Sequence, residues 1–418
     1  MADIKVVIGA NFGDEGKGLM TNYFCEQARH NNQSSIVVLH NGGSQRSHTV
    51  SYSPEVRYAF RHLGAGTFQG ADTYFAKDFI IDPMNFIEEY WKLLDLAYKN
   101  NLKLNYNVFA HKNCMLSFPS DALLNCIKEV ERGNSNHGSC GCGIFETINR
   151  NKTAYVCSIS DAVKMSRKQL REIILELRIY ATQNLELWRK ENNISHYSIE
   201  KTASYYKRLM EDDEIINRYL DNFYFMKALL HIDIDNKNIL NSYSVLTGYD
   251  NIVFEGGQGL LLDQNNKEYF PHLTPSNTGS LNPCNIIKYA GLTDSDIELC
   301  YVTRTYLTRH GAGSFPTECN KNNINSEMHD KTNEPNMFQG TLRYGLINVK
   351  ELYDRIDKDE NNFDLFHKTS LAITHLNETN HWLYTDNGKE RICLEPKYKY
   401  YLSSGNSTIQ TVECVQER

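Results

Sequence analysis

Long apolar runs are missing from this chain of 418 residues. No stretch approaches the roughly 20 apolar residues that a helix needs to cross a bilayer, so no contact with a membrane is expected. The amino terminus also lacks a basic segment followed by an apolar core, so no secretory signal peptide is expected. These absences predict a cytoplasmic protein.

A surplus of positive charge is missing as well. Lys and Arg number 44 against 51 Asp and Glu, which gives a formal net charge of −7 at pH 7. Proteins that bind nucleic acid generally carry a basic surplus, so nucleic acid is not an expected partner. A local pocket for phosphate is still compatible with this balance.

Cysteine is present, but without the repeated spacing of a metal site. The 11 cysteines are scattered along the chain, which predicts free thiols in a reducing compartment. Cys140 and Cys142 form the one close pair, and no second pair of ligands lies near them in the sequence. A zinc or redox role for this pair is therefore the less favoured interpretation.

The chain has no internal repeat and no linker rich in Pro or Gly, which favours one large domain over residues 1–418. Five short runs rich in Val, Ile and Leu are typical of strands covered on both faces. They are residues 4–8, 35–39, 252–254, 297–302 and 371–374. Helical patterns lie between several of them. Together they predict an α/β fold with a central, mostly parallel sheet and flanking helices.

Two segments have a different character. Between about 160 and 245, apolar residues such as Leu170, Ile174 and Leu177 follow helical spacing, and Ser166 is the expected N-cap. This segment is predicted to be an all-helical insertion packed on the sheet. Residues 320–336 are rich in Asn, Glu and Lys and have no periodicity. They predict a mobile substrate loop over about 320–345.

The segment GDEGKG, residues 13–18, follows the first predicted strand. Glycines let backbone amides approach a phosphate, and the start of a following helix adds partial positive charge. Lys17 supplies a counter-charge, and Asp14 can act as a base or a magnesium ligand. The segment is not a Walker A loop, because Asn11 and Gly18 stand where that pattern requires Gly and Ser or Thr. An ordinary glycine-rich turn is the plainer alternative.

Further polar segments follow the other predicted strands. They are NGGSQRSHT at 41–49, FEGGQG at 254–259 with TPSNT at 274–278, and TRHGAG at 308–313 with FPTE at 315–318. In open α/β sheets, ligands bind in the crevice at the carboxyl ends of the strands. The sequence therefore predicts one composite ligand site at that edge of the sheet.

Taken in order, these segments resemble the motifs of adenylosuccinate synthetase. The matches are GDEGKG, GG-x4-HT, FEG-x-QG-x-LLD with its SNT continuation, and TR-x-GAG-x-FPTE. The resemblance spans most of the chain. It implies a ligase that uses a nucleoside triphosphate to phosphorylate O6 of a 6-oxopurine nucleotide, after which L-aspartate displaces the phosphate. It also implies a homodimer and a requirement for Mg²⁺.

The resemblance assigns catalytic roles to four side chains. Asp14 takes the N1 proton of the purine, and His48 and Gln258 stabilise O6 and the transferring phosphoryl group. Lys17 neutralises phosphoryl charge. Magnesium is expected on Asp14 and on the backbone carbonyl of Ser47. The plainer interpretations are a structural histidine at 48 and a glutamine that closes a turn at 258.

The resemblance also implies which residues hold the two nucleotides. Ser139 and Thr274 correspond to residues that bind the 5′-phosphate, and Arg150 corresponds to the arginine offered across the dimer interface. The purine nucleoside monophosphate is expected at Asn11, Ser139, Cys140, Arg150 and Thr274. The donor triphosphate is expected at Gly16, Gly18, Thr49, Thr374, His375, Asn377, Ser404 and Gly405.

The donor segment departs from the family pattern. Thr374-His375-Leu376-Asn377 stands where the family reads guanine through T-K-x-D. An asparagine amide lacks the charge of aspartate and can donate as well as accept, which suits N6–H and N1 of adenine. ATP or dATP is therefore at least as strongly expected as GTP.

The aspartate loop departs as well. Residues 338–345, FQGTLRYG, keep one arginine where the family has several. A dicarboxylate still needs a cation, so L-aspartate is expected at Gly340, Thr341 and Arg343, with Arg309 as a second cation. The plainer interpretation makes Arg309 a surface charge.

The nucleotide pocket differs from the family pattern at two places. The family has an asparagine and small residues before the catalytic histidine, and this chain has Gln45, Arg46 and Ser47. The family also has a G-T-T-G-R-G-like stretch, and this chain has GSCGCG at 138–143. Guanine and hypoxanthine share the O6/N1–H lactam, so the same chemistry suits either. The changes resemble phage-type 2-aminoadenylosuccinate synthetases, which aminate dGMP toward 2,6-diaminopurine DNA and favour adenine nucleotides as donors. Retention of Asp14 argues against that branch.

The favoured substrate is dGMP, with IMP and GTP as the alternative, and a non-catalytic nucleotide sensor is a third hypothesis. If the chain is encoded by a phage, it is expected in the host cytoplasm.

Overall fold

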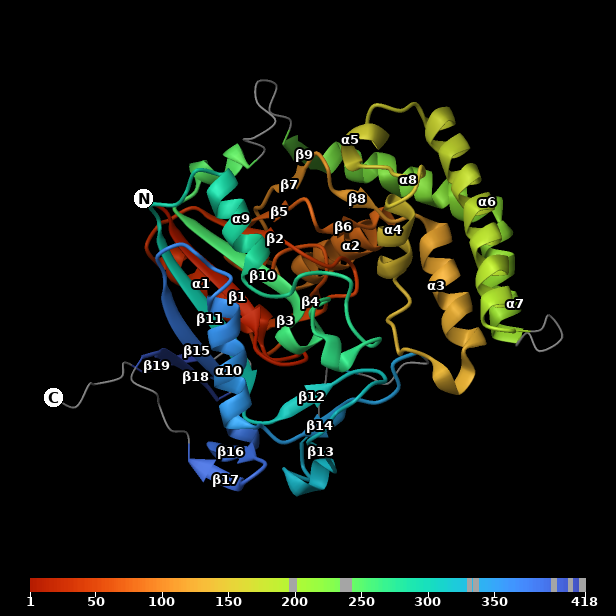
Figure 1. The fold of residues 1–418 in the computed structure, drawn as a ribbon. Helices are drawn as coiled ribbons and strands as arrows, with labels where there is room; N and C mark the ends of the chain where they lie inside the picture. The colour runs from red at the N-terminus through yellow and green to blue at the C-terminus, as the bar shows by residue number, and fades with distance from the viewer. Residues whose placement is uncertain are drawn as a thin grey trace.

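A ten-stranded sheet forms the centre of the molecule in this computed structural model (Figure 1). The structure describes residues 1–194, 201–233, 243–328, 333, 338–391, 397–404 and 409–412. The strand order is β19-β18-β15-β11-β1-β10-β2-β5-β7-β9. Neighbouring strands are parallel, except that β18 and β19 are antiparallel. The strands are β1 (Asp3–Gly9), β2 (Ser35–Leu39), β5 (Asp72–Phe75), β7 (Val108–His111), β9 (Leu230–Asp233), β10 (Asn251–Gly259), β11 (Asp296–Arg304), β15 (Lys368–Thr374), β18 (Lys399–Ser403) and β19 (Ile409–Val412).

The five strands expected from the apolar runs are confirmed, and they are contiguous in the sheet as β15-β11-β1-β10-β2. Strand β10 is longer than predicted. The glycine-rich segment expected to be a loop continues the strand to Gly259, with a bulge in the pairing between Val7 and Gly9 of β1. Because these strands are parallel, the polar segments that follow them all lie at one edge of the sheet.

Helices cover both faces of the sheet. Val7 and Val37 belong to a buried apolar cluster with Met20 of α1 and Phe86 of α2. The alternate residues, such as Val6, belong to a second cluster with α9 and α10. Burial on both faces explains why the strands are continuous apolar runs rather than alternating patterns. These helices are α1 (Lys17–His30), α2 (Pro83–Lys99), α9 (Leu281–Tyr289) and α10 (Val349–Glu360).

A group of helices lies at the β9 side of the molecule, with α6 and α7 outermost (Figure 1). Helices α6 and α7 pack on α3, and α8 packs on α2. The expected N-cap is confirmed, because the Ser166 side chain accepts the Gln169 amide. The expectation that residues 160–245 are all helical is corrected, since Leu230–Asp233 is strand β9, paired with β7. The helices are α3 (Pro119–Glu131), α4 (Ile144–Asn151), α5 (Ile159–Ala162), α6 (Arg167–Glu191), α7 (Lys201–Glu211) and α8 (Asp213–Leu229).

Among the described residues, four small sheets accompany the central sheet. They are β12 (Leu307–Arg309) with β14 (Arg343–Gly345) and β13 (Glu318–Cys319), β3 (His48–Ser51) with β4 (Arg57–Phe60), β6 (Ile80–Ile81) with β8 (Met115–Leu116), and β16 (Trp382–Thr385) with β17 (Gly388–Arg391). The loop predicted over about 320–345 ends on β14. Residues 329–332 and 334–337 of that loop lie outside the described part of the chain.

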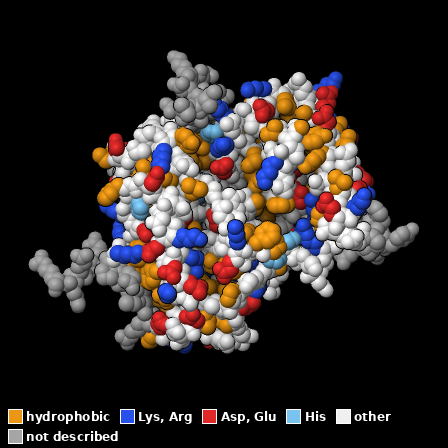
Figure 2. All heavy atoms as spheres, in the orientation of Figure 1, with side chains coloured by type: hydrophobic (Ala, Val, Ile, Leu, Met, Phe, Trp, Pro, Cys, Tyr) orange, Lys and Arg blue, Asp and Glu red, His pale blue; other side chains and the backbone are white. Residues whose placement is uncertain are grey.

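The charged side chains at the surface and the cysteine thiols are distributed as the composition predicts. Within the described part of the chain, every helix is too short or too polar to span a bilayer. On the face drawn in Figure 2, basic and acidic side chains are interspersed rather than gathered by sign. The nine cysteines among the described residues are free thiols.

Candidate active site

The GDEGKG loop connects β1 to α1 and packs against strand β3. Gly16 precedes the helix with φ 99°, a left-handed conformation that favours glycine. A Cβ atom on Gly18 would lie 2.9 Å from the Cβ atom of His48. The Glu15 carboxylate, held by the Asn11 amide at 2.5 Å, lies 4.0 Å from Nζ of Lys17. The loop therefore places the Gly18 backbone against His48 and the Lys17 side chain beside Glu15.

Asp14 occupies the left-handed region at φ 57° and contacts a histidine from a distant loop. Its Oδ2 atom lies 3.1 Å from Nε2 of His310, and its carbonyl accepts Nε of Arg304 at 2.5 Å. Burial alone would raise the pKa of Asp14. The His310 hydrogen bond and the nearby charge of Arg304 outweigh burial and hold that pKa well below its usual range. Asp14 is therefore ionised at neutral pH.

His48, at the start of β3, is held by a buried ion pair. Nδ1 of His48 lies 2.5 Å from Oε1 of Glu255, and Nη2 of Arg46 lies 2.9 Å from the same oxygen. Burial lowers the pKa of His48 to about 4, and the charge of Arg46 adds to this effect. The imidazole is therefore neutral at pH 7. Because a carboxylate can only accept, Nδ1 carries the hydrogen and Nε2 presents a lone pair.

The Nε2 atom of His48 is one of several buried polar atoms without a partner among the described residues. Oε1 of Gln258 and both side-chain polar atoms of Gln45 share this property. The two amides lie close together, because a Cβ atom on Gly42 would be 2.8 Å from Nε2 of Gln45 and 3.5 Å from Oε1 of Gln258. Buried polar groups are normally paired, so this cluster indicates a site that a polar ligand completes.

The loop predicted to hold the 5′-phosphate is bonded to a carboxylate of its own chain. The amides of Gly138 and Ser139 donate to Oε2 of Glu129 at 2.9 and 3.2 Å. A Cβ atom on Gly138 would lie 2.5 Å from Cα of Gly311, so this loop packs on the TRHGAG segment. Cys140 lies half-buried in the same loop. The two N–H groups aimed at one anion show that the loop has the geometry of an anion site.

Arg150 does not lie at a surface. Its side chain is fully buried, and its Nε and Nη2 atoms bond to Asp121 at 2.9 and 3.0 Å. Nη1 and Nη2 also donate to the carbonyls of Tyr155 and Leu116 at 2.8 and 2.7 Å. This geometry does not fit an arginine offered to a partner subunit, because the guanidinium donors are used inside its own subunit.

Asn11 and Thr274, two residues expected to bind the monophosphate, differ in burial. Asn11 is buried, and its amide donates to Thr303 and accepts from Arg355 at 2.6 Å. The side chain thus ties β1 to β11 and α10. Thr274 is half-buried, and its backbone N–H donates to the Leu262 carbonyl at 2.9 Å.

The two arginines expected to bind L-aspartate are neighbours. Arg343 forms a two-pronged pair with Glu318, with Nε 2.8 Å from Oε1. Arg309 is buried, lies over the ring of Phe12 at 4.5 Å, and donates to the Ala312 carbonyl at 3.1 Å. Burial lowers the pKa of Arg309 to about 10. Gly340 and Thr341 are exposed beside Arg343.

Some of the residues expected to bind the donor lie where β15 ends. Oγ1 of Thr374 donates to the Glu15 carbonyl at 2.8 Å, and a Cβ atom on Gly16 would lie 3.0 Å from Thr374. His375 adopts φ 60°, and Asn377 is exposed in the short helix that follows. Oγ1 of Thr49 is buried and has no described partner. Ser404 is half-buried, and Gly405 lies outside the described residues.

Magnesium fits the donors at this edge. Among the described residues there is no group of three or more His, Cys, Asp or Glu side chains that could hold a metal ion. One carboxylate, Asp14, and the carbonyl of exposed Ser47 suit Mg²⁺, because this ion usually takes one or two protein oxygens and completes its shell with phosphates and water.

Four side chains of the site were not assigned from sequence. Glu255 and Arg46 stand inside motifs that were singled out, whereas Glu129 lies on α3 with no local signal. His310 is the variable residue of TR-x-GAG, and its titratable ring was the signal that could have identified it.

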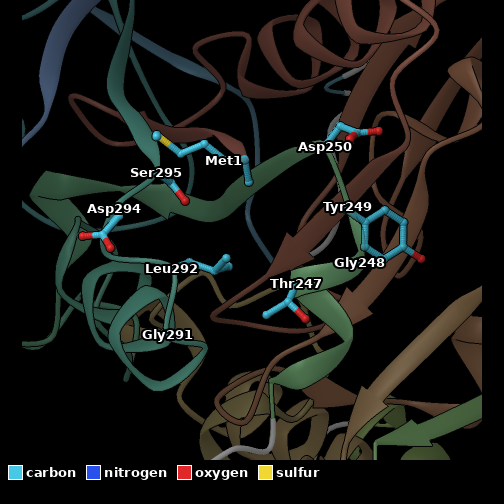
Figure 3. A pocket seen from close by; sticks show the side chains of 10 residues that line it. Met1, Thr247, Gly248, Tyr249, Asp250, Gly291, Leu292, Asp294 and Ser295 are labelled. Atoms are coloured by element: carbon cyan, nitrogen blue, oxygen red, sulfur yellow. The ribbon is translucent and has the colours of Figure 1, made fainter.

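A surface hollow of about 320 Å³ lies away from this chemistry (Figure 3). Met1, Asp250 and Ser295 are among its lining residues, and they precede β1, β10 and β11. The hollow is therefore at the amino edge of the parallel strands, opposite the polar segments.

The sequence comparisons agree on one family. A family model described as adenylosuccinate synthetase matches residues 6–349. The adenylosuccinate synthetase of Porphyromonas gingivalis is 29% identical over 76% of this chain and 66% of its own length. That of Prochlorococcus marinus strain NATL1A is 31% identical over 82% of this chain and 70% of its own length. The chain thus spans about two thirds of the length of these curated relatives.

Two solved structures share the fold. Adenylosuccinate synthetase from Plasmodium falciparum, fully ligated, has a TM-score of 0.60 and 17% identity, covering 98% of this chain and 86% of that one. The cyanophage S-2L succinoaminodeoxyadenylate synthetase (PurZ), bound to dGMP and to dATP as an energy donor, has a TM-score of 0.60 and 12% identity, covering 98% and 95%. At these identities the likeness shows the fold alone.

Proposed function

Because the chain belongs to the adenylosuccinate synthetase family, we propose that it is a carbon–nitrogen ligase that joins L-aspartate to a 6-oxopurine nucleotide at the expense of a nucleoside triphosphate. One observation carries this proposal. Asp14 follows β1, His48 lies in the segment after β2, and Gln258 ends the neighbouring strand β10, and Nε2 of His48 and Oε1 of Gln258 are buried without a partner among the described residues. A non-catalytic sensor has no need for a general base there.

In the first step, Asp14 accepts the proton from N1 of the purine. The electron pair of the broken N1–H bond moves through the lactam to O6, which attacks the γ-phosphorus of the triphosphate. The nucleoside diphosphate leaves, and Lys17 at the start of α1 neutralises its charge. Gln258 turns its amide toward the negative charge on O6. Magnesium, when bound to Asp14 and the Ser47 carbonyl, supplies further charge neutralisation at the phosphates.

In the second step, the amine of L-aspartate attacks C6, the phosphate on O6 leaves with the C–O electrons, and the attacking nitrogen releases one proton to the departing phosphate. Arg343 and Arg309 supply positive charge for the two carboxylates. Arg343 already holds one carboxylate, that of Glu318, in a two-pronged pair. The aspartate carboxylate replaces Glu318 at this guanidinium.

The same proposal includes dGMP as the nucleotide and ATP or dATP as the donor. Two features support this choice. Asn377 stands at the exposed base-reading position after β15, where its amide suits adenine. Gln45 and Arg46 change the pocket walls beside His48, which favours a nucleotide other than IMP. The cyanophage protein of the same fold carries dGMP and dATP.

We also propose that the chain acts as a homodimer.

The alternative function is conventional adenylosuccinate synthesis from IMP and GTP. The retained Asp14 and the adenylosuccinate synthetases among the curated relatives favour it. Both functions use the same chemistry at O6, and they differ in the 2-amino group of the purine and in the base of the donor.

The test is release of phosphate with L-aspartate and Mg²⁺, measured across dGMP, GMP and IMP, each with ATP, dATP and GTP. We expect the highest kcat/KM with dGMP and an adenine donor, and a product whose mass equals dGMP plus aspartate minus water. Turnover with IMP and GTP alone would establish the alternative. If no pair of nucleotides gave phosphate release, but the nucleotides still bound, the chain would be a non-catalytic sensor. Light scattering during size-exclusion chromatography checks the dimer.

A further inference from the structure

We propose that Arg46 is a further catalytic residue, whose free N–H groups donate to the phosphoryl group as it is transferred to O6. This inference rests on the proposed ligase function, but it does not depend on which 6-oxopurine nucleotide is the substrate. Arg46 stands two residues before His48, in the loop that leads from β2 to β3.

The Arg46 side chain is fully buried, but only part of its guanidinium is satisfied. Nη2 lies 2.9 Å from Oε1 of Glu255, whereas Nε and Nη1 have no hydrogen-bond partner among the described residues. Burying polar N–H groups without partners costs free energy, so the chain tolerates them where a ligand completes them. Arg150 provides the contrast, because it is equally buried and its Nε, Nη1 and Nη2 atoms all have acceptors.

Pairing with Glu255 is not a sufficient explanation for a buried arginine here. Glu255 already accepts a hydrogen bond from His48 and a second one, at 3.1 Å, from the Ala65 amide. Arg46 contributes one nitrogen to this carboxylate and leaves the others unused. A shorter polar side chain could satisfy Glu255 without burying a second charge.

The donors of Arg46 that have no partner among the described residues indicate an anionic ligand, and the neighbouring side chains show that the site is polar. His48 Nδ1 is 3.1 Å from Nη2 of Arg46, and the unpaired Nε2 is on the same ring. Gln45 next to it has an unpaired amide. An arginine presents donors in a planar fork that matches phosphate oxygens, and negative charge is spread over three such oxygens during phosphoryl transfer. A fixed cation in a buried site stabilises that charge strongly.

The first experiment compares wild type, R46Q and R46K without aspartate. Exchange of oxygen between the bridging and non-bridging positions of the β-phosphate of the donor reports reversible transfer to O6. The acceptor is whichever 6-oxopurine monophosphate the wild type uses. We expect R46Q to lower this exchange by about 100-fold or more, and R46K to lie between, because it keeps the charge and loses the fork. The dissociation constant of the monophosphate should change by less than about threefold, because Arg46 acts on the transferring group.

The inference is overturned if R46Q exchanges oxygen at the wild-type rate, or if its loss is entirely in nucleotide affinity. R171Q on α6 is the matched control, because it removes an arginine from an exposed pair with Asp213. Circular dichroism and thermal unfolding check that each variant is folded. If R46Q does not fold, the rate of oxygen exchange in R46K tests the inference instead. Exchange at the wild-type rate in R46K overturns the inference.

A second measurement separates this inference from the proposed function. ADP with aluminium fluoride mimics the transferring phosphoryl group and requires no turnover. We expect R46Q to bind this mixture at least about 30-fold more weakly, because its fluorides lose the guanidinium, with ADP alone unaffected. Equal binding by wild type and R46Q overturns the role of Arg46. A wild type without exchange on any 6-oxopurine overturns the proposed function instead.

Discussion

Arg309 and Arg343 lie directly opposite each other on the antiparallel strands β12 and β14. Like charges in this position are destabilising, so each guanidinium is compensated separately. Glu318 pairs with Arg343, and Arg309 lies against backbone carbonyls and aromatic rings. Two cations held side by side, one of them already on a carboxylate, form a site suited to a dicarboxylate.

Replacing Arg343 by alanine should weaken the binding of L-aspartate. A hydrogen-bonded charge is worth about 1.5–3 kcal/mol, so KM for aspartate is expected to rise by about 10- to 100-fold, with KM for both nucleotides little changed. Steady-state kinetics with aspartate varied at saturating nucleotides measures this. R171A, far from the site, should match wild type. An unchanged KM for aspartate would mean that the dicarboxylate binds elsewhere.

Replacing Asp14 by asparagine should abolish the first chemical step. Asparagine keeps the shape but cannot accept the N1 proton, so kcat is expected to fall by about 100- to 10,000-fold. Nucleotide affinity, measured by isothermal titration calorimetry, should be nearly preserved. The Asp14 carboxyl has a pKa well below its usual range, so its ionisation does not limit the rate at neutral pH. Full activity in D14N would remove the general-base assignment.

Replacing Asn377 by aspartate should shift the donor preference toward GTP. A carboxylate accepts from N1–H and the 2-amino group of guanine but cannot donate to N1 of adenine. The ratio of kcat/KM for GTP to that for ATP is expected to rise by about tenfold or more, equivalent to about 1.4 kcal/mol. N101D, an exposed site after α2, is the matched control. No change in the ratio would show that the base is recognised by other residues.

Replacing Arg150 by methionine should destabilise the fold. Removing one partner of a buried pair leaves Asp121 uncompensated, which typically costs about 3–5 kcal/mol. Denaturant unfolding measures the loss. R171M breaks a partly exposed pair and should cost at most about 1 kcal/mol. If R150M were as stable as wild type, and regained activity when mixed with an inactive D14N protein, Arg150 would act across subunits.

Acidification should destabilise the protein through its buried histidines. Burial lowers the pKa of His111 from 6.5 to about 4, with the charges of Lys112 and Lys77 contributing. The unfolded chain therefore binds the proton first, so the free energy of unfolding falls as pH falls from 6.5 toward 4. H111Q should lose part of this slope, measured by urea unfolding at a series of pH values. An unchanged slope would show that the pKa of His111 is the same in the folded and in the unfolded chain.

The main strands of the central sheet were predictable because each is encoded by a short run of consecutive residues. Parallel strands buried on both faces require continuous runs of Val, Ile and Leu, and such runs are visible in the sequence. Strand β9 was missed, since its four residues follow directly after α8 and carry no separate signal. Strand β10 extends beyond its apolar run because glycines adapt to the bulge beside β1.

The sequence by itself determined the chemistry available at the carboxyl edge: a carboxylate, a lysine, a histidine, an amide and two arginines, all of them except Arg343 in segments that follow a predicted strand. Only the tertiary structure decided their partners. Arg150 pairs with Asp121, Asp14 pairs with His310, and Arg46 beside His48 keeps donors without a partner among the described residues. The physical reason is that hydrogen bonds and burial depend on side chains that the fold brings together from distant segments, and no local pattern encodes those distances.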